Sequence, residues 1–175
     1  MDLIRIGDKL ISRRKIQRAI DRMLERRAQG LSQHDVAAEM GIDRAFVSHL
    51  ERLGEVRRGR RIALIGFPVQ NKAELEALAR EEGVDFVLLL NNAERWSYVE
   101  DVSGAELFNR VMEIIARIRE CDQIVFLGSD MRIRWMESVL GPDRVIGIEL
   151  GPSPITEDRY VPPERVRDVL AKGRG

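Results

Sequence analysis

The fold of the N-terminal part is set by the stretch Gly30-Leu-Ser-Gln-His-Asp-Val-Ala-Ala-Glu-Met-Gly-Ile-Asp-Arg-Ala-Phe-Val-Ser-His-Leu-Glu-Arg52. Its spacing predicts two short helices joined by a tight turn. Ser32 is placed to cap the first helix, and Asp35 can complete a weak capping box, although Glu or Gln is preferred there. Gly41 stands where the chain must leave this helix with a positive φ, which costs little only for Gly or Asn. Asp43 is expected to cap the second helix.

Apolar residues of the two helices fall on faces that can pack against each other. The first helix has Val36, Ala37 and Met40 on its inner face, and Ala37 is small enough for a second helix to cross closely. Val47 and Leu50, three residues apart, form the inner face of the second helix. The residues left on the outer face of the second helix are Arg44, Ala45, Ser48, His49 and Arg52.

This outer stripe has the shape and chemistry of a surface that reads the DNA major groove. Arg44 can pair bidentately with guanine, a contact worth about 1–3 kcal/mol of discrimination. Ser48 and His49 can bond to base edges or to phosphates. Gln33, in the first turn of the preceding helix, can reach a phosphate beside the amides at that helix's N-terminus. The residues therefore predict a helix-turn-helix that binds double-stranded DNA.

Residues 31–52 resemble the helix-turn-helix of the XRE (Cro/C1-type) family of transcriptional regulators. The matching residues are Leu31-Ser32-Gln33, Val36-Ala37, Gly41-Ile42, Val47-Ser48 and Leu50-Glu51-Arg52. The resemblance implies that the second helix reads bases and that Gln33, which opens the first helix, contacts the DNA backbone. The positions that it implies to be base-facing are Arg44, Ala45, Ser48 and His49.

After this stretch the chain departs from the XRE pattern. Members of that family continue with one or two more helices, whereas here Gly54 leads within eight residues to a predicted strand. A preceding helix would then supply the rest of the core and end at Gly30. Its apolar residues at helical spacing are Ile16, Ala19, Ile20, Met23 and Leu24. A trimmed XRE fold and a homeodomain-like three-helix variant both fit, and a helical hairpin that binds another protein or dimerises is the alternative to DNA binding.

The segment Gly54-Glu-Val-Arg-Arg-Gly-Arg-Arg61 separates this part from the rest of the chain. Two glycines, four arginines and one aliphatic residue make it a linker or a boundary loop. Its arginines, among them Arg57 and Arg58, either touch phosphates beside the groove or belong to a solvated linker. The predicted parts are a helix-turn-helix domain at 1–54, a linker at 55–61 and an α/β domain at 62–175.

The remainder of the chain alternates between short apolar runs and amphipathic stretches. The apolar runs, interpreted as strands, are 62–66, 84–90, 123–127 and 144–150. The stretches with helical spacing are 71–82, 105–119, one through Ile133, Met136, Val139 and Leu140, and a short one at 164–170 after a Pro-rich tail. Near-continuous apolar strands separated by such helices predict a parallel sheet covered on both faces. We expect a small, doubly wound, mostly parallel four-stranded α/β domain.

Open α/β sheets bind ligands beyond the carboxyl ends of their strands, near the point where strand order reverses. If the order in this domain is 2-1-3-4, that crevice lies between its first and third strands. A small, anionic effector bound there would meet the loops that follow the strands, with a helix N-terminus near Ser129 and with Trp96 as an aromatic wall. The predicted ligand-binding residues are Lys72, Asn91, Asn92, Arg95, Gly128, Ser129 and Asp130.

The pattern of residues argues against catalysis. No Gly-x-Gly-x-x-Gly follows the first strand, and residues 66–72 lack the second glycine and the Lys-Ser/Thr ending of a P-loop. Both histidines, His34 and His49, fall in the helix-turn-helix, and Cys121 is interpreted as a small buried residue. Ser129 has no accompanying base in a recognisable motif. We predict neither an enzyme nor a cofactor or metal site.

The charge is divided unevenly between the two parts of the chain. The formal net charge of the 175 residues is zero. Residues 1–61 contain 15 Lys and Arg against nine Asp and Glu, a charge of +6, whereas residues 62–175 contain 14 against 20, a charge of −6. Such asymmetry is typical of a basic partner-binding module attached to a second domain, and a chance distribution is the alternative.

The composition bounds the class of protein. Hydrophobic residues make up 44% and charged residues 33%, as in soluble globular proteins. No apolar run approaches the ~20 residues that a membrane span needs, and the first ten residues lack the apolar stretch of a secretory signal. The one cysteine excludes an internal disulfide and a multi-cysteine metal site. These features predict a cytoplasmic protein without a membrane partner.

Together these observations predict a homodimeric transcriptional regulator that reads a palindromic operator, because a helix-turn-helix reads two half-sites when its owner is a two-fold dimer. The α/β domain is expected to dimerise, through Met131, Trp135, Met136 or the Pro-rich tail, and to sense a small metabolite. A second hypothesis is a small α/β enzyme or nucleotide-binding protein with a helical protein-interaction module. A third is a DNA-binding structural protein without an effector.

Overall fold

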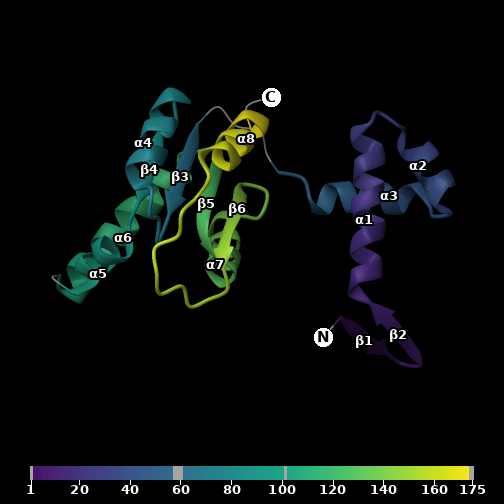
Figure 1. Cartoon of the computed structure of the whole chain (residues 1–175), viewed down its shortest axis with the longest axis horizontal. Coiled ribbons are helices and arrows are strands. Elements are labelled where there is room, and N and C mark those ends of the chain that lie inside the picture. Colours follow the sequence, from purple (N-terminus) through teal and green to yellow (C-terminus); the bar gives the residue numbers. More distant parts are fainter. Residues whose placement is uncertain (1, 57–60, 101, 174–175) are drawn as a thin grey trace. The chain divides into compact units, whose positions relative to one another are not determined.

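Two compact units make up the chain. A computed structural model describes residues 2–56, 61–100 and 102–173. The first unit is Met1–Glu55 and the second is Val56–Gly175. The chain is an α/β protein in which N-terminal helices precede a four-stranded parallel sheet with interleaved helices, as Figure 1 shows.

The first unit begins with a β-hairpin, so the prediction of an all-helical N-terminal domain is wrong for residues 3–12. β1 (Leu3–Ile6) pairs in antiparallel register with β2 (Lys9–Ser12). Between these two runs of mostly aliphatic residues stand only Gly7 and Asp8, and a two-residue connection with glycine is a hairpin signal. Gly7 takes the positive φ of 58° that such a turn requires.

Three helices follow the hairpin: α1 (Arg13–Ala28), α2 (Gln33–Met40) and α3 (Arg44–Leu53). The predicted cap of α2 is confirmed, since Ser32 Oγ accepts the Asp35 amide at 3.1 Å. The predicted left-handed turn is confirmed as well, because Gly41 ends α2 with φ 64°. Asp43 stands at the N-cap of α3 but its side chain makes no capping hydrogen bond, so that detail of the prediction is wrong.

The core of the first unit is small and comes from all three helices. Its buried residues are Met23, Val36, Ala37 and Val47. Leu31, Met40, Ile42 and Leu50 pack against them. The inner faces predicted for α2 and α3 are thus confirmed. Met23 is the buried residue that α1 contributes, so the preceding helix does complete the core.

The strands of the second unit run parallel in the order β4-β3-β5-β6. They are β3 (Ile62–Gly66), β4 (Phe86–Leu89), β5 (Gln123–Ser129) and β6 (Val145–Gly151). Counted along this unit the order is 2-1-3-4, the order considered from the sequence, and it reverses between β3 and β5. These two central strands are buried along their whole length. They also approach closely, since a Cβ on Gly66 would lie 2.8 Å from the Cβ of Leu127.

Helices cover both faces of this sheet. They are α4 (Lys72–Glu81), α5 (Asn92–Glu100), α6 (Gly104–Arg119), α7 (Asp130–Leu140) and α8 (Pro163–Gly173). On one face α4 and α8 bury Leu75 and Leu170. On the other face α6 and α7 bury Ile118 and Leu140. The predicted parallel sheet covered on both faces is confirmed.

Helix α5 was not expected, because the segment after the second strand was interpreted as a loop. The side chain of Asn91 accepts the Glu94 amide at 2.8 Å, and the Glu94 carboxylate accepts the Asn91 amide at 3.0 Å. This reciprocal pair is a capping box, and the Asn-x-x-Glu spacing that forms it is visible in the sequence. α5 buries none of its residues, and Ile118 is the buried residue of α6.

The segment at 152–162 runs across the carboxyl edge of the sheet rather than away from it. Ser153 donates its amide to Asp130 Oδ1 at 3.0 Å, and Asn92 donates its amide to Asp158 Oδ1 at 2.6 Å. The Arg159 amide bonds to the Pro68 carbonyl at 3.1 Å. The tail thereby joins the loops that follow β3, β4 and β5.

Within the ranges that the structure describes, no helix combines the length and the apolar character needed to cross a bilayer.

The left-handed conformation of Gly41 gives a prediction about the stability of the first unit. Gly41→Ala should lower its free energy of unfolding by about 1 kcal/mol, since a non-glycine residue at positive φ is strained even in open space. Gly54→Ala is the matched control, because Gly54 has a negative φ and ordinary contacts at 3.9 Å.

Two spectroscopic signals separate the units in this measurement. Both tryptophans, Trp96 and Trp135, belong to the second unit, so tryptophan fluorescence follows that unit while far-UV circular dichroism follows both. In urea unfolding, Gly41→Ala should lower the midpoint of the circular dichroism transition that belongs to the first unit. The transition followed by tryptophan fluorescence should stay unchanged. Equal effects of the two substitutions would contradict the expectation.

Candidate functional site

The outer face of α3 is solvent-exposed, as the sequence predicted. Arg44, Ala45, His49 and Arg52 are exposed, and Ser48 is half-buried. Val47, on the opposite face, is fully buried and holds the helix against α2. The fold therefore presents one polar stripe of a helix whose other side is anchored in the core.

Two members of this stripe are bonded to each other. Arg52 Nη2 lies 2.7 Å from His49 Nδ1. A guanidinium can only donate, so Nδ1 accepts in this hydrogen bond and the ring proton is assigned to Nε2. The Nε2–H group of His49 is thereby left as a donor, suited to the acceptors of guanine N7 and O6 or to a phosphate oxygen.

One carboxylate ties the three helices of this unit together. Glu51 on α3 accepts Arg27 Nε of α1 at 2.5 Å and Gln33 Nε2 of α2 at 2.8 Å. The Arg27 guanidinium also donates to the Leu31 carbonyl. The hydrogen bond from Arg27, and then the one from Gln33, hold the pKa of Glu51 below its usual value. Gln33, predicted to meet a DNA phosphate, has its amide group committed to Glu51.

A second carboxylate holds α1 against α2. Glu39 Oε1 accepts Arg22 and Arg26, each at 3.0 Å, and the two guanidinium groups lower its pKa. Three arginines of the first unit, Arg22, Arg26 and Arg27, thus pair with two carboxylates within it. Pairing leaves the net charge of the unit unchanged, but it holds these three guanidinium groups on their own chain.

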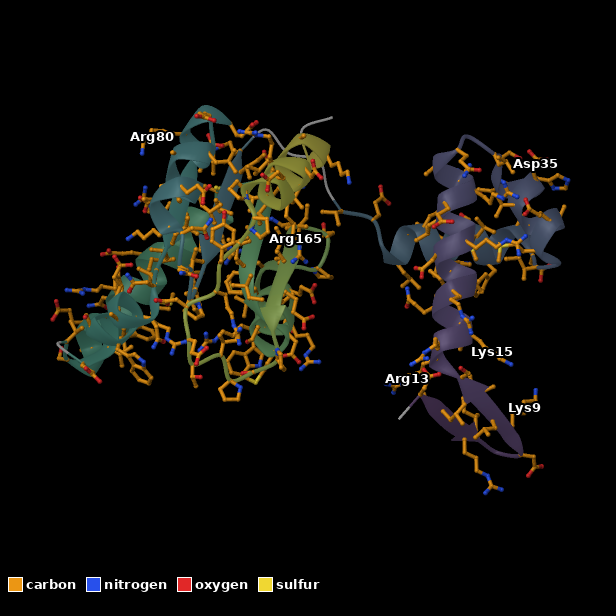
Figure 2. The ribbon with its side chains drawn as sticks, in the orientation of Figure 1. Lys9, Arg13, Lys15, Asp35, Arg80 and Arg165 are labelled. Atoms are coloured by element: carbon orange, nitrogen blue, oxygen red, sulfur yellow. The ribbon has the colours of Figure 1, made fainter. Side chains whose placement is uncertain are left out.

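A shallow hollow lies at the start of α2, beside the outer stripe of α3. Its lining residues are Arg27, Ser32, Gln33, His34 and Arg44. Two guanidinium groups and an imidazole surround a helix N-terminus there, an arrangement that favours an anion. Asp35 lies at the same end of α2, where Figure 2 labels it, and its carboxylate accepts the Ser32 hydroxyl at 2.6 Å. That hydrogen bond lowers the pKa of Asp35 and keeps a negative charge near the hollow.

Other basic residues of the first unit lie elsewhere. Figure 2 shows Arg13 and Lys15 at the start of α1, and Lys9 on the hairpin at the beginning of β2. The predicted phosphate contacts Arg57 and Arg58 lie outside the described residues. Within the second unit, Arg61 donates its amide to Asp122 at 3.0 Å and pairs with Glu120 at 3.2 Å.

The residues predicted to bind an effector are largely engaged with their own chain. Lys72 Nζ lies 2.9 Å from Glu94 Oε1, which raises the pKa of Lys72 and lowers that of Glu94. Asn91 forms the capping box of α5, and Asn92 donates its side-chain amide to the Thr156 carbonyl at 3.1 Å. These three residues therefore hold α4, α5 and the tail together.

The ligand residues predicted at the end of the third strand of this unit, Gly128, Ser129 and Asp130, also have structural roles. Ser129 is buried and its hydroxyl caps α7 by accepting the Arg132 amide at 3.5 Å. Asp130 accepts the Ser153 amide and pairs with Arg134 at 3.4 Å. Gly128 lies against the ring of Phe126, where a Cβ would come within 2.6 Å of the ring. The tail that Asp130 holds spans the edge where the crevice was expected.

Arg95 differs from the other predicted ligand residues, and it has a neighbour that the sequence analysis missed. Its Nη1 atom is buried without a hydrogen-bond partner, and the same holds for Arg132 Nη1. Arg132 lies on α7 with its guanidinium 4.9 Å from the ring of Phe67. Arg95 and Phe67 also line an apolar cavity of about 310 Å³. The sequence offers no local signal for this pair, because α5 and α7 are brought together only by the sheet.

Groups for metal or nucleophilic chemistry are not assembled in the described part of the chain. Over residues 2–56, 61–100 and 102–173, no three His, Cys, Asp or Glu side chains form a cluster that could hold a metal ion. Burial raises the pKa of the Cys121 thiol, which disfavours the thiolate that a nucleophile needs.

Comparison of the chain with protein-family models, with curated proteins and with solved structures finds no match.

The Glu51 carboxylate gives a prediction about pH. Its lowered pKa means that its contribution to stability is present above the unfolded-state pKa of about 4.3 and is lost as the pH falls through the lower folded-state value. Glu51→Gln should destabilise the first unit by about 1 kcal/mol at pH 7, since the partly buried ion pair with Arg27 is lost. The difference from the parent should shrink below about pH 4.

Urea unfolding between pH 3 and pH 7, followed by circular dichroism, measures this difference. Glu25→Gln is the matched control, because Glu25 is an exposed glutamate of α1. A Glu51→Gln effect that is the same at every pH, or that the control reproduces, would contradict the assigned role of the carboxylate.

Proposed function

We propose that the chain is a sequence-specific DNA-binding transcriptional regulator that acts as a homodimer on a palindromic operator. The observation that carries the proposal is the exposed polar stripe of α3 on a helix whose inner face is buried against α2 across the Gly41 turn. An α-helix with such a stripe fits the major groove of B-DNA. The resemblance of residues 31–52 to XRE regulators supports the same use of these helices.

Base recognition falls to the exposed residues of the stripe. Arg44 presents a guanidinium that can pair bidentately with guanine O6 and N7. His49, oriented by its hydrogen bond with Arg52, presents its Nε2 edge to a base. Ser48 and Ala45 lie beside them, where a hydroxyl and a methyl group suit a base edge and the thymine methyl group. Arg52 supplies positive charge at the end of the stripe.

A phosphate of the DNA backbone is the natural occupant of the hollow at the start of α2. Arg44 can face a phosphate there together with the helix N-terminus, and Arg27 and His34 line the same hollow. Phosphate contacts of this kind set the register of a helix in the groove without reading sequence. Gln33 then acts mainly as the residue that positions Glu51.

Dimerisation is proposed for an apolar face of the second unit. Phe108, Val111 and Met112 are exposed on one side of α6, and Phe108 is 63% exposed. Of the residues named from the sequence, Trp135 is 58% exposed, whereas Met136 packs against the core. A run at positions i, i+3 and i+4 is the helical pattern that a symmetric helix pair buries. The exposed hairpin residues Leu3, Ile6 and Leu10 offer a further apolar surface on the first unit.

The position of the tail argues against the enzyme or nucleotide-binding hypothesis. Phosphates of nucleotides bind at the carboxyl edge of such sheets, near the switch point. Here the tail at 152–162 covers that edge through its bonds to Asp130, Asn92 and Pro68. The DNA-binding proposal stands without a catalytic role for the second unit.

Base reading is tested with the double variant Arg44→Ala, His49→Ala on the DNA upstream of the protein's own gene. Affinity for that duplex should fall at least tenfold, because a bidentate guanine contact alone is worth about 1–3 kcal/mol. Affinity for a scrambled duplex should fall much less. Fluorescence anisotropy at several salt concentrations measures both, with a slope of about −0.9 per phosphate neutralised. Arg18→Ala, an exposed arginine of α1, is the matched control. Unchanged sequence preference would refute the proposal.

The dimer is tested by placing a charge on each exposed apolar helix of the second unit. Phe108→Glu should raise the dimer dissociation constant at least tenfold, since a buried unpaired carboxylate at an interface is costly. Trp135→Glu on α7 should leave it unchanged. Analytical ultracentrifugation measures both. A monomeric parent protein, or a larger effect from Trp135→Glu, would refute the assignment to α6.

A further inference from the structure

We propose that the second unit binds an amphipathic anion, with an oxyanion head group between Arg95 and Arg132 and an apolar body in the cavity beneath α5 and α6. This names the chemical class of the effector in the proposed regulator. Binding of the ligand itself does not depend on DNA binding, so the two can be tested separately.

The cavity is apolar and lies between the sheet and two loosely anchored helices. Its volume is about 310 Å³, at the small end of the range for ligand sites. The lining residues from α5 and α6 include Tyr98, Val99, Leu107, Val111 and Ile115. Because Ile118 is the buried residue of α6 and α5 buries none, these helices leave the space in front of Leu88 and Phe126 unfilled. An apolar ligand would restore the dispersion contacts that such a gap lacks.

One guanidinium group, that of Arg95, lines this cavity, and a second, that of Arg132, stacks on the cavity residue Phe67. Arg95 and Arg132 each bury an Nη1 atom that has no hydrogen-bond partner, and neither makes an ion pair with a described residue. Other arginines of the same unit are paired, as Arg110 is with Glu106 at 2.9 Å. A buried donor without a partner costs free energy, and a charged one costs more. These unpaired donors therefore lower the stability of the ligand-free unit, and an anionic ligand that accepts their hydrogen bonds would compensate for that loss.

The two arginines lie around the same phenylalanine, because Arg132 stacks on the Phe67 ring and Arg95 lines a cavity with Phe67. Burial lowers the pKa of Arg132, and the charge of Arg95 lowers it further. Aromatic faces hold both groups, because Arg132 lies 4.9 Å from the Phe67 ring and Arg95 lies 5.2 Å from the Trp96 ring. Stacking fixes the planes of the guanidinium groups and leaves their N–H edges for a ligand. Paired arginine forks match the oxygens of a carboxylate or a phosphate.

The head-group site and the cavity adjoin each other. Arg95 and Phe67 both line the cavity, and Phe67 carries the Arg132 guanidinium on its ring. Phe67 follows β3, Arg95 lies on the helix after β4, and Arg132 lies on the helix after β5. In Figure 1, α5 and α6 lie together at one end of the second unit. The site is thus built at the carboxyl edge of the sheet, but on the face of α6 and α7, and not in the crevice that the tail covers.

The first experiment uses decanoate as the probe with the full-length protein. Decanoate should bind saturably in isothermal titration calorimetry and raise the unfolding temperature. Acetate, which has the head group alone, and decyltrimethylammonium, which has the same chain with the opposite charge, should each bind at least tenfold more weakly. Inorganic phosphate that binds as well as decanoate would overturn the apolar part of the site. Equal binding of decyltrimethylammonium would overturn the anionic part.

The second experiment removes the charges. Arg95→Met and Arg132→Met should each weaken decanoate binding at least tenfold, because a charge-assisted hydrogen bond is lost. Without ligand, the same variants should unfold at the parent's temperature or above it, since each removes a partly buried charge whose Nη1 atom has no hydrogen-bond partner. A purely structural role for these arginines predicts the opposite shift. Arg80→Met is the matched control, because Figure 2 shows Arg80 on α4 and its side chain is exposed.

The outcomes separate this site from the proposed function. The Arg44→Ala, His49→Ala variant should bind decanoate like the parent even where it no longer recognises its DNA. Failure of that variant on DNA with intact decanoate binding supports both assignments. Decanoate binding that survives in Arg95→Met and Arg132→Met, or is absent from the parent, overturns the site whatever the DNA result.

Discussion

Parallel pairing of β3 with a neighbour on each side is the constraint on which the second unit depends. A strand buried on both faces needs helices above and below the sheet, and because the strands are parallel every crossover begins at the same carboxyl edge. Gly66 lets β3 approach Leu127 of β5 closely. That edge then gathers Phe67, Arg95 and Arg132 from three separate crossovers. The distinctive chemistry of this unit is a consequence of how its sheet is wound.

In the first unit, a single carboxylate, that of Glu51, links all three helices. A core of four buried residues is small for three helices. Glu51 adds polar contacts among them, because its carboxylate accepts hydrogen bonds from Arg27 of α1 and Gln33 of α2. These hydrogen bonds join the inner side of α3 to α1 and α2, and the outer stripe of α3 stays exposed to solvent. Glu51 also holds the Arg27 guanidinium on its own chain, so that the proposed DNA contacts fall mainly to Arg44 and Arg52.

Arg95 and Arg132 differ from the paired arginines of both units, and the difference bears on function. Arg22, Arg26 and Arg27 are paired and stabilise the fold. Arg95 and Arg132 are partly buried, adjacent and unpaired, which lowers stability in the absence of a ligand. Residues that lower the stability of the free protein are expected at ligand sites, where the bound ligand compensates for the lost stability. A ligand that fills the gap beneath α5 and α6 would also order the helices next to the proposed dimer face.

The sequence by itself determined the local features of this protein. The Ser32 cap, the Gly41 turn, the inner faces of α2 and α3 and the strand–helix alternation follow from residue type and spacing. The hairpin at Gly7-Asp8 and the capping box of α5 were equally local and were overlooked. Only the tertiary structure decided that Gln33 bonds to Glu51, that the tail closes the expected crevice, and that Arg132 lies beside Arg95. Each of these joins segments distant in the chain, and such contacts depend on how elements pack, which residue spacing does not encode.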